Sequence, residues 1–383
     1  MNTLPYSTQL IDKADLNEVN KILTSRFLTK GRKTLEFENI IKSFVRSKYS
    51  LAVINASSAL ILACRALGVK KNDIVWTSAN TYVASINAGL HCGAKIDLLD
   101  INLDDYNICT DLLEKKLIKA KKNKKLPKVI IVVHLAGYPL DLKKMKRLSK
   151  IYKFKIIEDA SHAFGSKYEN TRIGDCHFSD VCVFSFHPVK VITTAEGGAI
   201  TTNNIKIYKK ILQLRENGIE RDGVKKKLDS NFYDVVDLGY NFRINEINSA
   251  LGISQIKKTK SYIDKKRKIS EYYFKKLKNE NIILPNYDLN RVHSWHLFII
   301  RMNFSRIKKK KIQLTNFLKK KKIFVNTHYI PLNKFTYIKK LIKNKNYKYS
   351  EKYYSEAISI PIYPHLSRKE QDYVIENILS FIK

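Results

Sequence analysis

The segment that decides the fold reads VIIVVH at residues 129–134, LKKMKRLSKIY at residues 142–152 and KII at residues 155–157. The first and last stretches are short, apolar and rich in β-branched residues, as buried strands are. The middle stretch repeats its apolar residues at helical spacing. A strand, an amphipathic helix and a second strand in this order predict two parallel strands joined by a crossover helix.

The same alternation continues on both sides of this unit, from about residue 50 to residue 205. Further strands are predicted at Leu51–Ile54, Ile74–Trp76, Lys95–Leu99, Val181–Phe184 and Ala199–Thr201, and further helices at Ala59–Leu67 and Val83–Cys92. Seven strands alternating with helices predict an α/β fold with a mainly parallel seven-stranded sheet that is covered on both faces.

The pattern changes after residue 205. It predicts helices at Ile207–Asn217, Asn245–Ile256 and about Lys260 to Leu277, then strands at His296–Arg301 and Ile323–Thr327 and a last helix from Lys369. We therefore expect a large domain over residues 1–255 and a smaller carboxyl-terminal α+β domain over residues 256–383. Because no Pro/Gly-rich linker separates them, the two are expected to share an interface.

Composition limits the class of protein. No stretch reaches the ~18 to 20 apolar residues of a membrane span, and the amino end lacks a basic patch followed by an apolar segment, so we expect a cytoplasmic protein without membrane partners. The 5 cysteines contain no C-x-x-C pair, so neither a disulfide framework nor a metal site is expected. The net charge of +36 raises a nucleic-acid-binding or regulatory protein as an alternative. Because the lysines are spread through the chain, a codon bias toward Lys, Ile and Asn explains them better.

Ligands of open parallel sheets bind beyond the carboxyl ends of the strands, so the residues there are candidates for the site. Asp159 ends one strand, where a buried carboxylate could keep a pyridine nitrogen protonated or could simply cap the next helix. Ser185 and Lys190 follow another strand. Lys190 has apolar or hydroxylic flanks over ten residues, which indicates a buried amine suited to a Schiff base rather than a solvated surface lysine. The Ser185 hydroxyl could bind a phosphate.

Two further strand ends carry weaker signals. Ser57 and Ser58 follow Leu51–Ile54 at the start of a helix, where free N–H groups and hydroxyls could bind a phosphate or form an ordinary N-cap. Tyr82 follows Ile74–Trp76 and could stack on a flat cofactor ring or pack in the core.

Five ordered motifs together resemble one family. They are NASSAL (55–60), TSANTYVAS (77–85), IIEDASHAFGS (156–166), FSFHPVKVITTAEGG (184–198) and LGYNFRINEINSALG (238–252). The chain resembles the DegT/StrS-type sugar aminotransferases, a branch of the fold-type I enzymes that use pyridoxal 5′-phosphate (PLP), from about Pro5 to the carboxyl end. The segments PYSTQLID (5–12), FLTKG (27–31) and THYIP (327–331) look most like the UDP-4-amino-4,6-dideoxy-N-acetyl-β-L-altrosamine transaminases of the pseudaminic acid pathway.

The resemblance implies a role for each matched residue. Lys190 would bind PLP as a Schiff base and move a proton, Asp159 would pair with the pyridine nitrogen, and His162 would lie near the phenolic oxygen. Tyr82 would stack on the ring. The phosphate would be bound by Ser57, Ser58 and Ser185, and by Asn241 of a neighbouring subunit, which requires a homodimer with composite active sites. The sugar nucleotide would be bound by Tyr6, Arg26, Phe27, Leu28, Thr29, Ala56, Ser185, Asn241, His328 and Tyr329.

The family also implies a reaction. L-glutamate would give its amino group to PLP, which would pass it to a UDP-linked 4-keto-6-deoxy sugar, UDP-2-acetamido-2,6-dideoxy-β-L-arabino-hex-4-ulose. A GDP- or dTDP-linked keto sugar is the alternative substrate. Dehydratases of the family carry histidine in place of the lysine, so Lys190 argues against that activity. Ala56 and Ala195 stand where the commonest family pattern has glycine, and neither change removes a reacting group.

Overall fold

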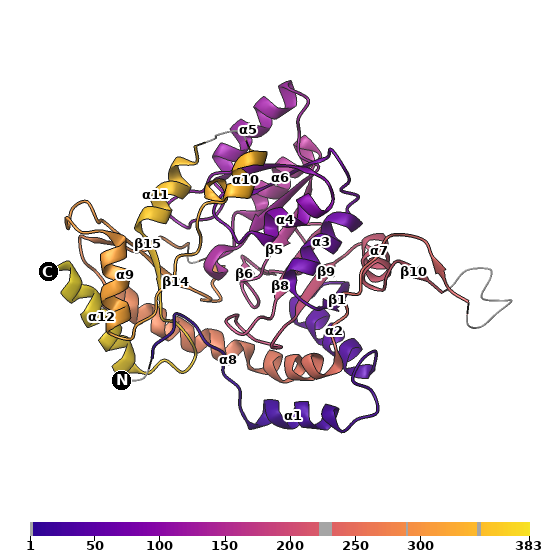
Figure 1. Ribbon diagram of the computed structural model, residues 1–383, viewed down its shortest axis with the longest axis horizontal. Coiled ribbons are helices and arrows are strands. Elements are labelled where there is room, and N and C mark those ends of the chain that lie inside the picture. Colours follow the sequence, from indigo (N-terminus) through magenta and orange to yellow (C-terminus); the bar gives the residue numbers. More distant parts are fainter. Residues whose placement is uncertain (1–2, 222–231, 289, 343–345) are drawn as a thin grey trace.

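A seven-stranded sheet forms the centre of the computed structural model, which describes residues 3–221, 232–288, 290–342 and 346–383 (Figure 1). The strand order is β1-β9-β8-β5-β4-β2-β3. The strands are β1 (Tyr49–Val53), β2 (Ile74–Ser78), β3 (Lys95–Leu99), β4 (Val129–Val133), β5 (Lys155–Asp159), β8 (Val181–Ser185) and β9 (Gly198–Thr202). All neighbours pair in parallel except β9, which is antiparallel to β8 and β1. The predicted mainly parallel seven-stranded sheet is confirmed.

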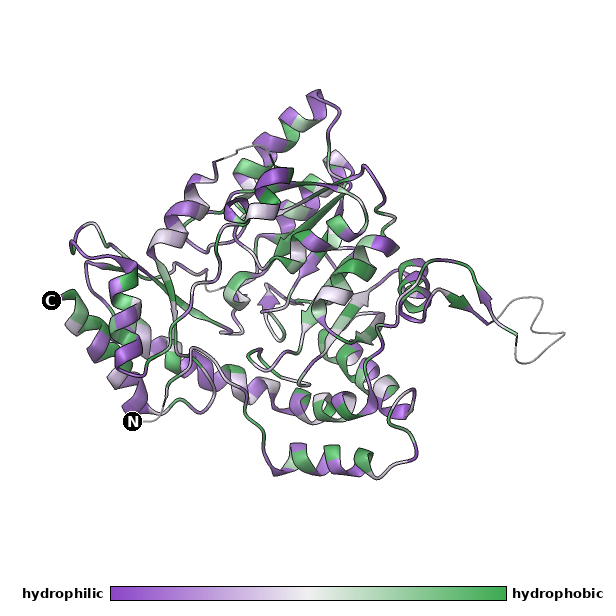
Figure 2. Cartoon of the chain, viewed as in Figure 1, coloured by the Kyte–Doolittle hydropathy of each residue, from purple (hydrophilic) through white to green (hydrophobic). Residues whose placement is uncertain are grey.

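Helices cover both faces of this sheet. One face is covered by α3 (Ala56–Ala66), α4 (Ala84–His91) and α7 (Ile205–Arg215). The other is covered by α2 (Arg32–Val45), α5 (Thr110–Lys122), α6 (Leu142–Tyr152) and the start of α8 (Glu246–Lys276). Alternate strand residues face alternate layers, as the pleat requires: Leu51 and Val53 pack under α3, whereas Ala52 faces α2. Figure 2 shows the strands in apolar colours between helices that carry both apolar and polar residues.

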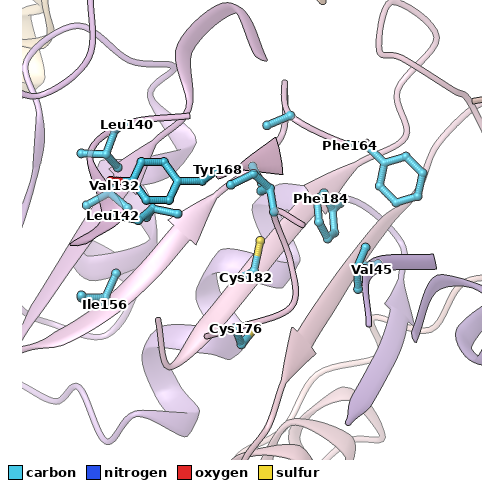
Figure 3. Close-up of a cluster of buried hydrophobic side chains, with 14 of the residues drawn as sticks. Val45, Val132, Leu140, Leu142, Ile156, Phe164, Tyr168, Cys176, Cys182 and Phe184 are labelled. Carbon is cyan, nitrogen blue, oxygen red and sulfur yellow. The ribbon is translucent and has the colours of Figure 1, made fainter. Parts of the chain in front are cut away.

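The layer beneath α2 and α6 is closely packed (Figure 3). Strand residues such as Val132 and Ile156 meet Leu142 of α6, and Phe164 contacts the ring of Phe184 edge to face at 5.1 Å. Burial of apolar surface at about 25 cal/mol per Å² stabilises this arrangement. This packing therefore stabilises the sheet, and the candidate site residues lie at the carboxyl ends of its strands.

Helix α8 is a single helix of 31 residues, and the prediction of two helices at Asn245–Ile256 and Lys260–Leu277 is wrong. The charged stretch Lys257–Lys260 does not interrupt it, because lysine is a good helix former. Figure 1 shows α8 running from beneath the sheet to the carboxyl-terminal part of the chain. Two helices that the sequence analysis did not predict, α1 (Lys13–Leu23) and α2, pack against it.

The carboxyl-terminal part has its own apolar cluster. An antiparallel sheet of β12 (Ile282–Ile283), β14 (Phe298–Met302) and β15 (Ala357–Ile360) packs against α9 (Lys311–Lys320) and α12 (Arg368–Ile382). The predicted strand Ile323–Thr327 is wrong: Ile323 forms one isolated bridge with Leu4, and Asn326 forms another with Ser359. Two different partners leave no continuous ladder for this segment. The division at residues 255/256 stays a prediction, and α8 runs through that point.

The smaller elements complete the description. They are α10 (Thr336–Leu341), α11 (Lys348–Glu356), the pair β10 (Ile219–Glu220) and β11 (Asp234–Val235), and a three-stranded sheet of β13 (Arg291–Val292), β6 (Lys167–Tyr168) and β7 (Thr171–Arg172). Within the described ranges, no helix is both long and apolar enough to cross a membrane.

Candidate active site

A cavity of about 690 Å³ lies beyond the carboxyl ends of the central strands. It takes residues from the amino end, the sheet and the carboxyl-terminal part of the chain. Of the predicted site residues, the cavity brings together Tyr6, Ala56, Ser57, Tyr82, Asp159, His162, Ser185, Lys190, His328 and Tyr329. The principle that open sheets bind ligands at this edge therefore locates the cavity correctly.

Asp159 is the last residue of β5 and is buried in the cavity wall. Its Oδ2 accepts a hydrogen bond from the Ser85 hydroxyl at 2.7 Å, and its Oδ1 accepts one from the Ser161 hydroxyl at 2.6 Å. Ser85 is itself hydrogen-bonded to Thr81 at 3.0 Å. No helix begins after Asp159, because residues 160–166 form turns, so the interpretation of this residue as a helix cap is wrong. Two hydroxyl donors hold the carboxylate in one orientation.

Lys190 lies in the turn that follows β8, where its N–H donates to the His187 carbonyl at 2.9 Å. Lys190 lines the cavity and is half-buried. This burial lowers the pKa of the Lys190 amine from 10.5 to about 8, while the nearby Asp159 charge acts in the opposite direction. Lys190 is therefore a cavity residue with an accessible neutral form, and not a solvated surface lysine.

The start of α3 forms another side of the cavity. The Asn55 side chain accepts the Ser58 N–H at 2.8 Å, so Asn55 is the N-cap and Ser58 lies in the first turn. Ser57 lines the cavity, whereas Ser58 is buried and does not. A Cβ atom at Gly198 would lie 2.6 Å from the Asn55 carbonyl carbon, so only glycine allows β9 to approach this helix start. The backbone donors of α3 are thus held against the sheet edge, where an anion can bind.

A cluster of ring-bearing side chains lines another part of the cavity. His162 Nε2 lies 3.1 Å from the Tyr329 hydroxyl oxygen, and the rings of Tyr82 and Tyr329 are 5.9 Å apart. Tyr82 is 57% exposed, so the interpretation of this residue as a core residue is wrong. His328 binds the Ser359 hydroxyl through Nδ1 at 2.8 Å. Burial and the Lys190 charge lower the pKa of His162 well below its usual value and that of His328 to about 3.

Two predicted elements lie outside the cavity of this chain. The segment Arg26–Thr29 lies between α1 and α2, with Phe27 and Leu28 exposed. The Leu28 carbonyl accepts the Glu246 N–H at 2.9 Å, which fixes the segment to the start of α8. Asn241 is exposed and forms a backbone bridge with Glu216.

Several cavity residues were not predicted from the sequence. They are Asn55, Thr81, Val83, Ser161, His187, Glu196, His296, Asn326 and Thr327. Ser85 was not predicted either: it does not line the cavity, but its hydroxyl donates a hydrogen bond to Asp159. Most are immediate neighbours of residues that were predicted, which is a usable signal. His296 had no such signal, because it lies 106 positions after Lys190 in a segment that reads as an ordinary strand. Its ring nevertheless lies 4.2 Å from that of His162.

The side chains present fit PLP. The cavity offers a buried carboxylate for a pyridinium nitrogen, an amine for an aldehyde, and a helix start for a phosphate. Lys190 has no hydrogen bond or ion pair from its amine among the described residues, which leaves the amine free for a covalent bond. Across the described part of the chain, no group of three or more His, Cys, Asp or Glu side chains could hold a metal ion.

Known proteins give the same assignment. Residues 9–379 match the model of the DegT/DnrJ/EryC1/StrS aminotransferase family. The UDP-4-amino-4,6-dideoxy-N-acetyl-β-L-altrosamine transaminase of Campylobacter jejuni strain 81-176 is 35% identical over 384 residues, which cover 99% of this chain and 98% of that protein.

Solved structures agree with the sequence comparison. PseC from Helicobacter pylori, an aminotransferase in the biosynthesis of pseudaminic acid, superposes with a TM-score of 0.92 at 29% identity and covers 100% of this chain and 99% of its own. Spr1654 from Streptococcus pneumoniae in its PMP-form gives a TM-score of 0.89 at 29% identity, with 99% of each chain covered. The chain belongs to the DegT/DnrJ/EryC1/StrS aminotransferase family, and it is a PLP-dependent sugar aminotransferase.

Proposed function

We propose that this protein transfers the amino group of L-glutamate to the C4 ketone of UDP-2-acetamido-2,6-dideoxy-β-L-arabino-hex-4-ulose, in a pathway of the pseudaminic acid type. The observation that carries the proposal is the single cavity in which Lys190, Asp159 and the start of α3 converge. Similarity to a transaminase that is named for such a UDP-linked sugar, over nearly the whole of both chains, supports the choice of sugar.

Bound PLP supplies an electron-accepting ring that stabilises the charge left when a proton leaves the amino-bearing carbon. Lys190 is the residue that forms the covalent link and then carries the proton between the two reacting carbons, because its lowered pKa of about 8 gives it a neutral form near physiological pH. Asp159 keeps the ring nitrogen protonated. The Ser85 and Ser161 hydroxyls donate hydrogen bonds to Asp159 and hold its carboxylate in one orientation.

The phosphate is bound in this proposal by the first turn of α3, with Ser57 and Ser58, and by Ser185. The sugar nucleotide is contacted by Tyr6, His328 and Tyr329, which line the cavity together, with the rings of Tyr6 and His328 5.0 Å apart. Ala56 lies at the same helix start and borders this space. None of the cavity-lining residues except Lys190 is a lysine or arginine, so cations for the diphosphate have to come from outside this lining.

A second copy of the chain is the proposed source of the missing contacts. Asn241 would reach the neighbouring cofactor phosphate, and Arg26–Thr29 would border the neighbouring sugar site. Exposed apolar side chains lie close to Asn241 in sequence and support a covered surface there: Tyr233, Val235, Val236 and Leu238, the last 75% exposed. A homodimer that buries this surface would also complete the active sites.

The test is an assay of purified holoenzyme with L-glutamate and a panel of UDP-, GDP- and dTDP-linked 4-keto-6-deoxy sugars. We expect the UDP-linked N-acetylated sugar to be aminated with the highest kcat/KM, with 2-oxoglutarate formed in equal amount. Lys190→Ala is the control, and it should form no 2-oxoglutarate. Preferred turnover of a GDP- or dTDP-linked sugar would contradict the proposed substrate while leaving the aminotransferase assignment intact.

A further inference from the structure

Two of the free cysteines lie side by side on the face of the sheet that α3 and α4 cover. Cys64 lies in the last turn of α3, and Cys92 is the C-cap of α4. The two helices pack against each other, and Cys92 lies against the apolar cluster that contains Cys64. The two thiols form a hydrogen bond with each other. A disulfide bond, in which the sulfur atoms are about 2 Å apart, therefore requires only a small approach of the two side chains.

The two thiols differ in their access to solvent. Cys64 is completely buried, whereas Cys92 is partly exposed. The hydrogen bond to Cys92 and burial raise the pKa of the Cys64 thiol well above its usual value. The same hydrogen bond lowers the pKa of the Cys92 thiol, and the Arg65 charge acts in the same direction. Cys92 is therefore the sulfur that an oxidant from solvent reaches first, and Cys64 lies behind it.

The other cysteines lack this arrangement. Cys176 and Cys182 are both buried in the apolar layer of Figure 3. Burial raises the pKa of the Cys176 thiol to about 12 and that of the Cys182 thiol well above its usual value, so neither offers an accessible thiolate. Cys109 is partly exposed at the N-cap of α5, but among the described residues no hydrogen bond joins its thiol to another cysteine. The Cys64–Cys92 pair alone joins an exposed thiol to a buried one in the described part of the chain.

We propose that Cys64 and Cys92 are a modification site, at which hydrogen peroxide converts the two thiols into a reversible disulfide between α3 and α4. The Cys92 thiolate attacks one peroxide oxygen, the O–O bond breaks, and Cys92 becomes a sulfenic acid with release of hydroxide. The Cys64 sulfur then attacks the Cys92 sulfur. The S–S bond forms as the S–O bond breaks, and the leaving hydroxide takes the Cys64 proton and departs as water. Because the two sulfurs are already in contact, this second step is intramolecular.

The disulfide limits how far Cys92 is oxidised. A sulfenic acid without a second thiol reacts with more peroxide and becomes a sulfinic acid, which thiol reductants do not reverse. A sulfinate at Cys92 places a charge against the apolar cluster beneath α3, where an unpaired charge is costly. The cavity depends on both helices, because α3 begins at its wall and Ser85 of α4 donates to Asp159. A bridge that a thiol reductant can open therefore protects the elements that form the active site.

Mass spectrometry of the folded holoenzyme tests the proposal. The protein is treated with hydrogen peroxide, its remaining thiols are alkylated, and peptides are compared before and after dithiothreitol. We expect the chain to lose two hydrogen atoms in mass, a disulfide to link the peptides of Cys64 and Cys92, and dithiothreitol to restore both thiols. In Cys64→Ala, Cys92 should instead gain two oxygen atoms that dithiothreitol does not remove. Cys109→Ala is the matched control, since it removes another partly exposed thiol and should leave the disulfide unchanged.

A sulfinic acid at Cys92 of the wild-type protein, with Cys64 still a free thiol, would overturn the proposal. Two unmodified thiols at these positions under conditions that oxidise Cys109 would overturn it as well, because Cys92 would then not be the reactive sulfur. The wild-type measurement does not depend on the folding of any variant. It also uses neither an amino donor nor a sugar, so its failure would leave the proposed function unaffected.

Discussion

The residues around Asp159 and Lys190 determine the orientation of the carboxylate and the pKa of the amine. Asp159 accepts two hydrogen bonds from hydroxyls, whereas the side-chain amine of Lys190 forms no hydrogen bond among the described residues. The two hydroxyls hold the carboxylate in one orientation, and burial lowers the pKa of the Lys190 amine to about 8. Both effects favour the chemistry proposed for these residues, and both depend on side chains that themselves need not touch a substrate.

Asp159→Asn should keep the shape of the site and remove its charge. We expect kcat to fall on the order of a hundredfold or more with little change in KM, because the charge acts on the transition state more than on substrate binding. Steady-state kinetics of the PLP-saturated variant measure this. Asp180→Asn is the matched control: this carboxylate accepts the Ile156 N–H at 2.9 Å at the amino ends of β5 and β8, the sheet edge opposite to the cavity, and its loss should leave activity per folded molecule intact. Equal losses in both variants would refute a specific role for Asp159.

Lys266 is a buried lysine outside the cavity. It lies on α8, is 1% exposed, and has no hydrogen bond or ion pair recorded among the described residues. Burial lowers the pKa of its amine from 10.5 to about 7. The unfolded chain therefore binds more protons than the folded protein between about pH 7 and 10.5, and the free energy of unfolding rises with pH in that window. Well below pH 7, the lysine is charged in both states and its burial costs most.

Lys266→Met should consequently stabilise the protein. We expect the free energy of unfolding to increase by about 1 to 4 kcal/mol at pH 7, as when buried ionic groups are replaced by apolar ones of similar volume. The gain should disappear as the pH approaches 10.5. Urea unfolding at several pH values measures it, with Lys265→Met, at the exposed neighbouring position, as the control without effect. A loss of stability in Lys266→Met that is independent of pH would contradict this account.

At the scale of elements, α8 and α2 meet at a contact that admits no additional atom. A Cβ atom at Gly252 would lie 2.5 Å from two ring carbons of Phe37 and 2.8 Å from a Thr194 methyl group. Gly252 thus allows the two helices to approach each other, even though glycine lowers the intrinsic stability of a helix by about 1 kcal/mol relative to alanine.

Gly252→Ala should destabilise the protein despite the better helix propensity of alanine. We expect a net loss of about 1 to 3 kcal/mol, because the buried ring of Phe37 has to move. Chemical denaturation measures the loss. The same type of change at an exposed position of the same helix, Ser261→Ala, should be neutral or slightly stabilising. If Gly252→Ala were as stable as Ser261→Ala, the close contact between α2 and α8 at Gly252 would not be the reason for a glycine at this position.

The helices and strands also show which parts of the fold can be predicted from the sequence. The seven strands were predicted because alternation of short apolar runs with amphipathic helices is a local pattern, and the cavity followed from the rule on strand ends. The strand at residues 323–327 was predicted wrongly, because a bridge to Leu4 is a pairing over more than 300 positions. The contacts of Ser85 and His296 with the site depend on tertiary packing in the same way, and no local pattern contains them.

The whole molecule can be tested through its proposed dimer. Lys190→Ala and Asn241→Leu chains, each inactive alone, should form a heterodimer in which one site receives both changes and the other neither. Up to about half of its sites should then work, by the reciprocity of a two-fold interface. The measurement requires co-expression with distinct tags, isolation of the mixed dimer and assay. An inactive mixed dimer, made from folded and dimeric partners, would show that Asn241 serves its own chain or none.

The pairing of Leu4 with Ile323 has a consequence for the order of events during protein synthesis. Tyr6 and the His328–Tyr329 pair border one cavity, yet the ribosome makes them more than 300 residues apart. The central sheet, complete by residue 202, can assemble while translation continues, since amino-terminal units fold first. The part of the cavity wall that residues 326–330 form cannot be in place until that segment has emerged. A nascent chain therefore holds Lys190 in an open groove, and capture of the cofactor in a closed pocket has to wait until synthesis is nearly finished.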